Sequence, residues 1–191
     1  MSNSKTKIMV EGAIMLALSI VLSFIKFKFL PFGGSITAVS MLPIMLFSIR
    51  HGLGWGMSLS VIYALFQMFM DLGEVLSWKL SIPMLIGCLA FDYIIAFSVL
   101  GIAGMFKNKS LGGNIAGMVI AMLLRYISHI LSGVVIFKSA GLIWDIDIEN
   151  SFLYSSIYNG AYMLPEIAFT IIVTVILFSV PQSKKLLLSK D

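Results

Sequence analysis

Long apolar runs dominate the chain, and short polar stretches separate them. A membrane-spanning helix needs about 20 mostly apolar residues. We therefore expect six transmembrane helices, at Ile8–Ile25, Ile36–Ile49, Leu53–Met70, Ile82–Phe106, Asn114–Phe137 and Tyr154–Val180. The second of these is short and contains Pro43, so it is the run least suited to a full crossing. The pattern predicts an all-α polytopic membrane protein in which residues 1–191 form a single transmembrane domain.

Composition supports the membrane assignment. Hydrophobic residues make up 59% of the 191-residue chain and charged residues 12%, whereas soluble domains have about 25% charged residues. The net charge of +4 does not indicate nucleic-acid binding, because the basic residues lie in short connections between apolar runs. The first apolar run is too long for a signal peptide, and we expect it to be retained as a helix.

The distribution of Lys and Arg predicts the orientation of the bundle. With a cytoplasmic N-terminus, the inner segments would hold Lys5, Lys7, Arg50, Lys107, Lys109, Lys184, Lys185 and Lys190, and the outer loops Lys26, Lys28, Lys79 and Lys138. Cytoplasmic loops are the Lys- and Arg-rich ones, so both termini are expected inside. The outer loop 138–150 is acidic; it could attract a cation or be an ordinary solvated loop.

One membrane segment has a polar face. Arg125, His129, Ser132 and Gly133 are spaced by three or four residues, which places them on one side of a helix. A charged side chain at the bilayer centre costs roughly 2.5–3.5 kcal/mol, so such residues usually face protein or a water-filled cavity. We interpret this face as the wall of a binding cavity, although His129 alone could equally be a hydrogen-bonded packing histidine.

Other polar residues of the apolar runs could complete such a cavity. The full set is Glu11, Asp92, Arg125, His129, Asn159 and Glu166. Asp92 could form an ion pair with Arg125 or receive a cationic ligand, and the two roles are compatible. Tyr93 and Tyr154 could pack or supply hydrogen bonds. We expect structural roles for Glu11 and Glu166.

The sequence gives little support for catalysis. It contains no H-E-x-x-H, G-x-S-x-G or Walker lysine motif. One intramembrane histidine among scattered carboxylates makes a weak metal or nucleophile site, so we expect neither an enzyme nor a cofactor or metal. Active transport would need an ion gradient or a partner that hydrolyses ATP. An intramembrane enzyme and an ion-coupled carrier remain alternatives.

The chain resembles the substrate-binding S-components of energy-coupling factor (ECF) vitamin transporters, specifically the thiamine-specific ThiT family. The resemblance covers nearly the whole chain. It rests on Ala13-x-x-x-Ala17, Met41-Leu42-Pro43-Ile44, Ser48-Ile49-Arg50-His51-Gly52, Asp92-Tyr93, Leu100-Gly101-Ile102-Ala103-Gly104, Arg125-Tyr126, His129, Ser132-Gly133 and Tyr154 with Tyr158-Asn159-Gly160. It implies a multi-pass protein of a prokaryotic cell membrane that binds thiamine from outside.

The resemblance also implies residue roles. Asp92 and Tyr93 would lie at the thiazolium ring, while His129, Tyr154 and Asn159 would contact the aminopyrimidine. Gly133 and Phe137 belong to the same expected site. A fixed positive charge is favourable in a low-dielectric cavity only when a carboxylate meets it, and flat rings invite aromatic stacking.

The partners follow from the resemblance as well. Ala13 and Ala17 would form the contact with an ECF transmembrane coupling subunit, because small residues let two helices approach closely. Two ATPase subunits would supply the energy, so this chain itself would use no ATP.

Two positions of the expected ligand site depart from the family pattern. The family often has glutamate where this chain has Asp92, and a tryptophan is expected where it has Phe137. A thiamine precursor, or another small vitamin, therefore remains an alternative ligand.

Overall fold

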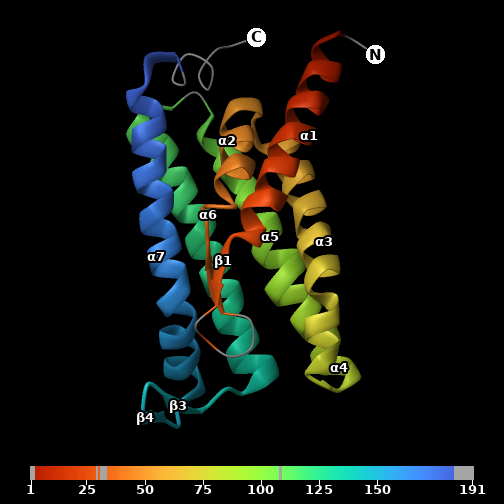
Figure 1. Cartoon of the computed structure of the whole chain (residues 1–191), viewed down its shortest axis with the longest axis vertical. Helices are drawn as coiled ribbons and strands as arrows, with labels where there is room; N and C mark the ends of the chain where they lie inside the picture. Colours follow the sequence, from red (N-terminus) through yellow and green to blue (C-terminus); the bar gives the residue numbers. More distant parts are fainter. Residues whose placement is uncertain (1–2, 29, 31–33, 108, 183–191) are drawn as a thin grey trace.

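In the part of the chain that the structure describes, the protein is a bundle of six helices, of which five are long (Figure 1). The computed structural model describes residues 3–28, 30, 34–107 and 109–182. The helices in chain order are α1 Asn3–Phe24, α2 Leu42–His51, α3 Leu53–Ser77, a fourth span built from α4 Ile82–Cys88, η1 Leu89–Ile95, α5 Ala96–Ser98 and η2 Val99–Phe106, then α6 Leu111–Ser132 with η3 Gly133–Phe137, and α7 Ser151–Ser179. Within the fourth span η1 is a π-helix and η2 a 3₁₀-helix, and η3 is again a π-helix.

Five of the predicted spans are confirmed as helices long and apolar enough to cross a membrane. The second span, predicted at Ile36–Ile49, differs, because its first part is a strand followed by a turn. Pro43 lies in the first turn of α2, where its missing N–H would have no helical partner in any case. The third span also differs: its helix continues beyond the predicted end at Met70 as far as Ser77.

The short helix α2 lies in the interior of the bundle. It packs against α1, α3 and η2, and every residue from Leu42 to Ile49 is buried. A helix that is apolar on all sides is typical of a segment surrounded by protein. Because α2 has only 10 residues, it fills the interior in the half of the bundle near the two termini (Figure 1).

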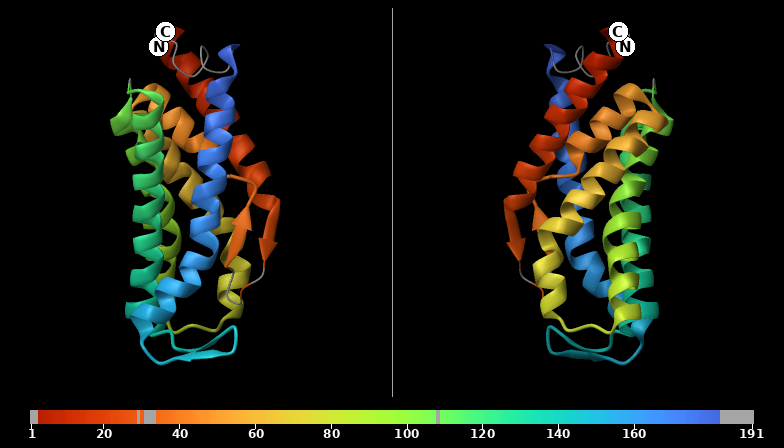
Figure 2. Two further views of the ribbon diagram at one scale, coloured as in Figure 1. Left: turned by 90° about the vertical axis from the view of Figure 1, so that its left-hand side faces the viewer. Right: turned by 90° about the vertical axis from the view of Figure 1, so that its right-hand side faces the viewer.

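Two short antiparallel hairpins accompany the helices. Strand β1 (Lys26–Lys28) pairs with β2 (Ser35–Thr37), with Phe27 opposite Ile36. Strand β3 (Gly141–Ile143) pairs with β4 (Ile146–Ile148) and lies across the end of the bundle opposite the termini. Figure 2 shows β2 beside α7, and the two elements are in contact.

The start of α1 and the end of α7 lie at the same end of the bundle (Figure 1), as the predicted arrangement with both termini inside requires. At this end Glu11 forms ion pairs with Arg50 (Nε–Oε1 3.3 Å) and His51 (Nε2–Oε2 3.1 Å). These contacts tie α1 to α2 and agree with the structural role expected for Glu11. Lys184, Lys185 and Lys190 lie outside the described residues.

Candidate functional site

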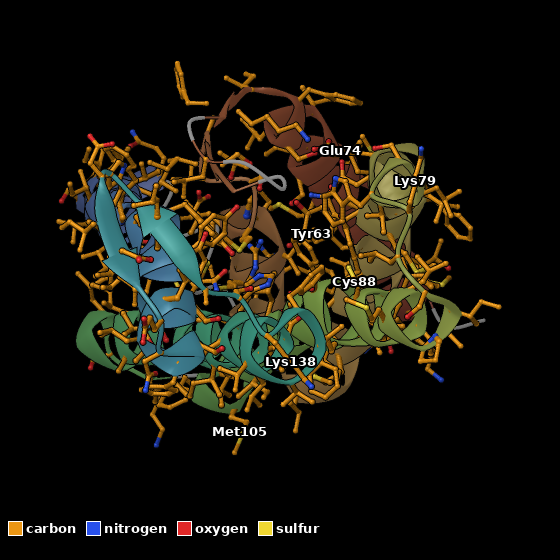
Figure 3. All side chains as sticks on the ribbon, turned by 90° about the horizontal axis from the view of Figure 1, so that it is seen from below. Tyr63, Glu74, Lys79, Cys88, Met105 and Lys138 are labelled. Atoms are coloured by element: carbon orange, nitrogen blue, oxygen red, sulfur yellow. The ribbon has the colours of Figure 1, made fainter. Side chains whose placement is uncertain are left out.

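A cavity of about 400 Å³ occupies the interior beyond α2. Ser40 and Met41, just before α2, contribute to its lining. Most of the rest comes from α3, η1, α6, η3, α7 and β2, with further residues from α1, β1, α4, α5 and the segment after η3. Seen from the end opposite the termini, Tyr63 and Cys88 point toward the middle of the bundle, whereas Met105 points away from it (Figure 3). Because α2 is too short to run the length of the bundle, the space beyond it remains open and can hold a ligand.

The structure brings together all the residues that the sequence singled out for a ligand site. Asp92, Tyr93, His129, Gly133, Phe137, Tyr154 and Asn159 all line this one cavity. They come from three separate spans, so their convergence is a property of the fold. Their contacts with a ligand remain a prediction.

Asp92 is held by two neighbours on the facing helix. Its Oδ1 lies 2.9 Å from Nδ1 of His129, and its Oδ2 accepts a hydrogen bond of 2.5 Å from Oγ of Ser132. Nε of Arg125 donates to Nε2 of His129 at 3.2 Å, so Nε2 acts as the acceptor and Nδ1 carries the proton donated to Asp92. The polar face of α6 thus fixes the position of a carboxylate on η1.

Arg125 is not in direct contact with Asp92, because the His129 ring lies between them. The guanidinium carbon lies 4.1 Å from the centroid of the Phe97 ring, and Nη1 donates to the sulfur of Met41. The alternative of a direct Asp92–Arg125 ion pair is therefore wrong. The guanidinium instead makes a cation–π contact with the Phe97 ring and a hydrogen bond to His129.

Aromatic rings cover much of the remaining wall. Tyr154 and Tyr158 are stacked with 9° between their planes and 6.2 Å between centroids, and Tyr162 meets Tyr158 edge-on at 6.2 Å. Trp78 meets Phe137 edge-on at 6.4 Å. Such rings offer faces to a flat or cationic ligand.

Asn159 is already hydrogen-bonded within α7. Its Nδ2 donates to the carbonyl oxygen of Ser155 at 2.8 Å, and its Oδ1 accepts a bond of 2.5 Å from the hydroxyl of Tyr162. These bonds fix which end of the amide is donor and which acceptor. An amide can make further bonds at each end, so Asn159 can still meet a ligand.

Two π-helical segments carry four of the predicted residues. Asp92 and Tyr93 lie in η1, and Gly133 and Phe137 in η3. π-Helical turns inside α-helices are frequent at functional sites. Here they set the directions of side chains on both facing spans.

Three lining residues were missed because they were assigned to a loop. Asp71, Glu74 and Trp78 extend the cavity wall along the end of α3. Asp71 also accepts a hydrogen bond of 3.4 Å from Lys26. Their spacing from Gln67, at four, seven and eleven residues, continues one face of a helix, and this periodicity was the signal that could have found them.

The donor set gives no sign of a metal site: among the residues that the structure describes, no three His, Cys, Asp or Glu side chains gather as ligands. What the cavity offers instead is a fixed carboxylate, hydrogen-bonding groups of both kinds and aromatic faces. This combination suits a small heterocyclic cation.

Comparison with known proteins points the same way. Residues 9–186 match the family described as thiamine transporter protein (Thia_YuaJ). The thiamine transporter ThiT of Bacillus subtilis (strain 168) is 31% identical over 197 residues, covering 93% of this chain and 94% of the relative. A solved structure of ThiT from Listeria monocytogenes superposes with a TM-score of 0.71 at 26% identity, covering 95% of this chain and 98% of that one. The resemblance drawn from the sequence is thus confirmed, and the chain belongs to the thiamine transporter family of YuaJ and ThiT proteins.

Proposed function

We propose that this chain is the S-component of an ECF transporter and that its cavity binds thiamine. The observation that carries this proposal is the convergence of seven predicted residues from three spans on one cavity of about 400 Å³. Ligand sites of this kind are largely apolar hollows with a few placed polar groups. The family membership supports the same ligand.

Asp92 would meet the thiazolium. Its carboxylate accepts hydrogen bonds from Ser132 and His129, which fix its position in the cavity wall. A permanent cation loses its hydration on entering the cavity and needs such a counter-charge. Tyr93, stacked near Phe97 with centroids 6.4 Å apart, adds an aromatic face beside it.

The aminopyrimidine would lie toward α7. This ring has an amine donor and acceptor nitrogens, which match the amide of Asn159 and the hydroxyl of Tyr154. His129 can join them when Arg125 gives up the bond to its Nε2. Phe137 would cover the ring from η3, and Gly133 in the same segment allows η3 to approach Ser155 of α7 closely.

A calorimetric titration tests the ligand. Thiamine, its phosphates, the free aminopyrimidine and the free thiazole are titrated separately into the detergent-purified protein. We expect thiamine to bind tightest, because it alone carries both the cation and the pyrimidine without added negative charge. Tighter binding of the uncharged pyrimidine would assign the cavity to a precursor instead.

The exposed face of α1 would contact the coupling subunit. Ala13 and Ala17 are both exposed there, among the large apolar side chains of Val10 and Ile14, which are 55% and 61% exposed. Small residues in an apolar face allow close helix–helix approach. Two ATPase subunits bound to the coupling subunit would then drive release of the ligand to the inside.

Substitution by tryptophan separates docking from binding. Ala13→Trp should abolish vitamin uptake by the assembled transporter and leave ligand affinity unchanged. Ala168→Trp is the matched control, because Ala168 is also an exposed alanine but lies on α7. Uptake that survives Ala13→Trp would exclude this face as the docking surface.

A further inference from the structure

Glu166 is a buried carboxylate of the cavity wall whose role differs from that of Asp92. It lies on α7, lines the cavity and is only 2% exposed. A second carboxylate in a site for a cation could act as another counter-charge. Its contacts indicate a different task.

Both oxygens of Glu166 are occupied by a single residue of β2. Oε2 accepts the backbone N–H of Thr37 at 2.7 Å, and Oε1 accepts the hydroxyl of the same residue. Hydrogen bonds to a charged acceptor are stronger than those between neutral groups. The carboxylate therefore faces the strand rather than the open cavity.

Thr37 ends a chain of donors that crosses the bundle. Nε2 of Gln67 donates to the hydroxyl of Tyr63 at 3.0 Å, and that hydroxyl donates to Oγ of Ser40 at 3.2 Å. Oγ of Ser40 lies 2.9 Å from Oγ of Thr37. Because the one hydroxyl proton of Thr37 goes to Glu166, Ser40 must be the donor in this last pair. All bonds thus run in one direction, from α3 to the carboxylate on α7, which only an acceptor can terminate.

A second contact holds the start of the same strand against α7. A Cβ atom on Gly34 would lie 2.8 Å from the hydroxyl oxygen of Tyr158, so the backbone approaches α7 as closely as glycine allows. Gly34, Ser35 and Thr37 all line the cavity. The strand is therefore part of the cavity wall, and Figure 2 shows it beside α7.

We infer that Glu166 is a positioning residue: it anchors β2 to α7 and so keeps the wall of the cavity closed around the ligand. The inference rests on the proposed thiamine site. In this proposal Glu166 determines how long the ligand stays bound, whereas Asp92 attracts the positive charge of the ligand. Release through this part of the wall requires the Thr37–Glu166 bonds to break.

Substitutions at both ends of the contact test the anchor. In Glu166→Gln the amide oxygen replaces only one of the two carboxylate oxygens, so it can keep one of the two bonds from Thr37. Glu166→Ala removes both bonds. We expect thiamine to dissociate roughly tenfold faster from Glu166→Ala, which corresponds to about 1.4 kcal/mol, and to dissociate faster by a clearly smaller factor from Glu166→Gln, as followed by stopped-flow displacement.

The partner residue provides a milder pair of variants in case Glu166→Ala folds poorly. Thr37→Val removes the hydroxyl and keeps the backbone N–H, so dissociation should accelerate by a smaller factor. Thr37→Ser keeps both groups and should behave like the unaltered protein. The double variant Glu166→Ala/Thr37→Val should be only slightly faster than Glu166→Ala alone, because Glu166→Ala already removes both Thr37–Glu166 bonds and Thr37→Val adds only the loss of the Ser40 contact.

Hydrogen–deuterium exchange of the peptide covering residues 34–42 gives a readout that needs no ligand. We expect faster exchange in Glu166→Ala than in Glu166→Gln. Equal losses of affinity in both variants would show that the charge of Glu166 acts on the ligand and would overturn the inference, as would unchanged dissociation and exchange in Glu166→Ala. If the unaltered protein fails to bind thiamine, the proposed function is wrong, while the exchange experiment still decides whether Glu166 anchors the strand.

Discussion

Replacing Gly133 by alanine should push η3 and α7, two elements of the cavity wall, apart by a distance that the structure predicts. Gly133 begins η3 and faces α7, and an added Cβ would lie 2.1 Å from Oγ and 2.9 Å from Cβ of Ser155. Rotation of the serine side chain moves only the oxygen, and the Cβ contact is still too short. Ordinary van der Waals contact begins at 3.4 Å, so the two helices must separate by roughly 0.5 to 1 Å here, an overpacking change that typically costs about 1–3 kcal/mol.

The separation would act directly on the proposed site. Ser132, which positions Asp92, precedes Gly133, and Tyr154 precedes Ser155 on the opposite helix. If the whole cost fell on the binding-competent arrangement, thiamine affinity would drop by about 5- to 150-fold, at 1.4 kcal/mol for each factor of ten. Calorimetry of the purified variant measures this loss, and thermal unfolding measures the cost to the fold.

Two variants make the experiment decisive. Gly133→Ala/Ser155→Gly removes the opposing side chain and should recover most of the lost affinity. Gly54→Ala adds the same methyl group to an exposed position of α3 with no atom within 4 Å, and it should leave binding unchanged. If Gly133→Ala behaved like Gly54→Ala, or if the double variant recovered nothing, the close approach would not limit the site.

Three further substitutions have clear expected outcomes. Asp92→Asn should weaken thiamine binding roughly 100-fold or more, because opposite charges about 4 Å apart attract by up to about 4 kcal/mol at an effective dielectric constant near 20; calorimetry with thiamine and with its uncharged pyrimidine would show the loss for the cation only. Phe137→Trp should keep the edge contact with Trp78 and tighten thiamine binding about two- to tenfold, because it enlarges the aromatic face. An unchanged dissociation constant would argue against contact between residue 137 and the ligand ring. Glu11→Gln should lower the Tm by about 2–4 °C by weakening the pairing with Arg50, a loss of roughly 1 kcal/mol, and should leave thiamine affinity unchanged.

The sequence predicted the long helices well because lipid imposes one simple condition on them. Backbone polar groups in a bilayer must be hydrogen-bonded within the segment, so long apolar runs become helices. The fourth span occupies Ile82–Phe106, as predicted. Apolarity alone could not indicate that this span contains π and 3₁₀ turns, because these depend on packing against its neighbours.

The errors lie where apolarity and membrane crossing no longer coincide. The stretch before α2 is apolar, but β2 and the following turn lie inside the protein, where side chains such as Glu166 satisfy the backbone. Conversely, Asp71 and Glu74 look like loop residues, yet they continue α3 because they face the cavity rather than lipid. Polarity in a membrane protein distinguishes lipid from non-lipid surroundings, and it does not by itself mark the end of a helix.

The site itself was predictable in its members but not in its connections. Polar residues at helical spacing indicated the face containing Arg125 and His129. Asp92 and Asn159 stood out as polar residues of the other two spans, and the family resemblance gave their expected roles. The hydrogen-bond order Arg125–His129–Asp92 could not be read from spacing, because it depends on how α6 is rotated against η1.

The ten-residue length of α2 has a consequence for how this fold can change its cargo. A helix of this length rises about 15 Å, half the thickness of a bilayer core, so one position in the bundle is filled on one side of the membrane and hollow on the other. The surrounding helices therefore do not have to move apart to make space for a ligand. Side chains around the hollow half can therefore be exchanged for others of similar bulk, and a new vitamin accommodated, while the filled half continues to hold the scaffold together.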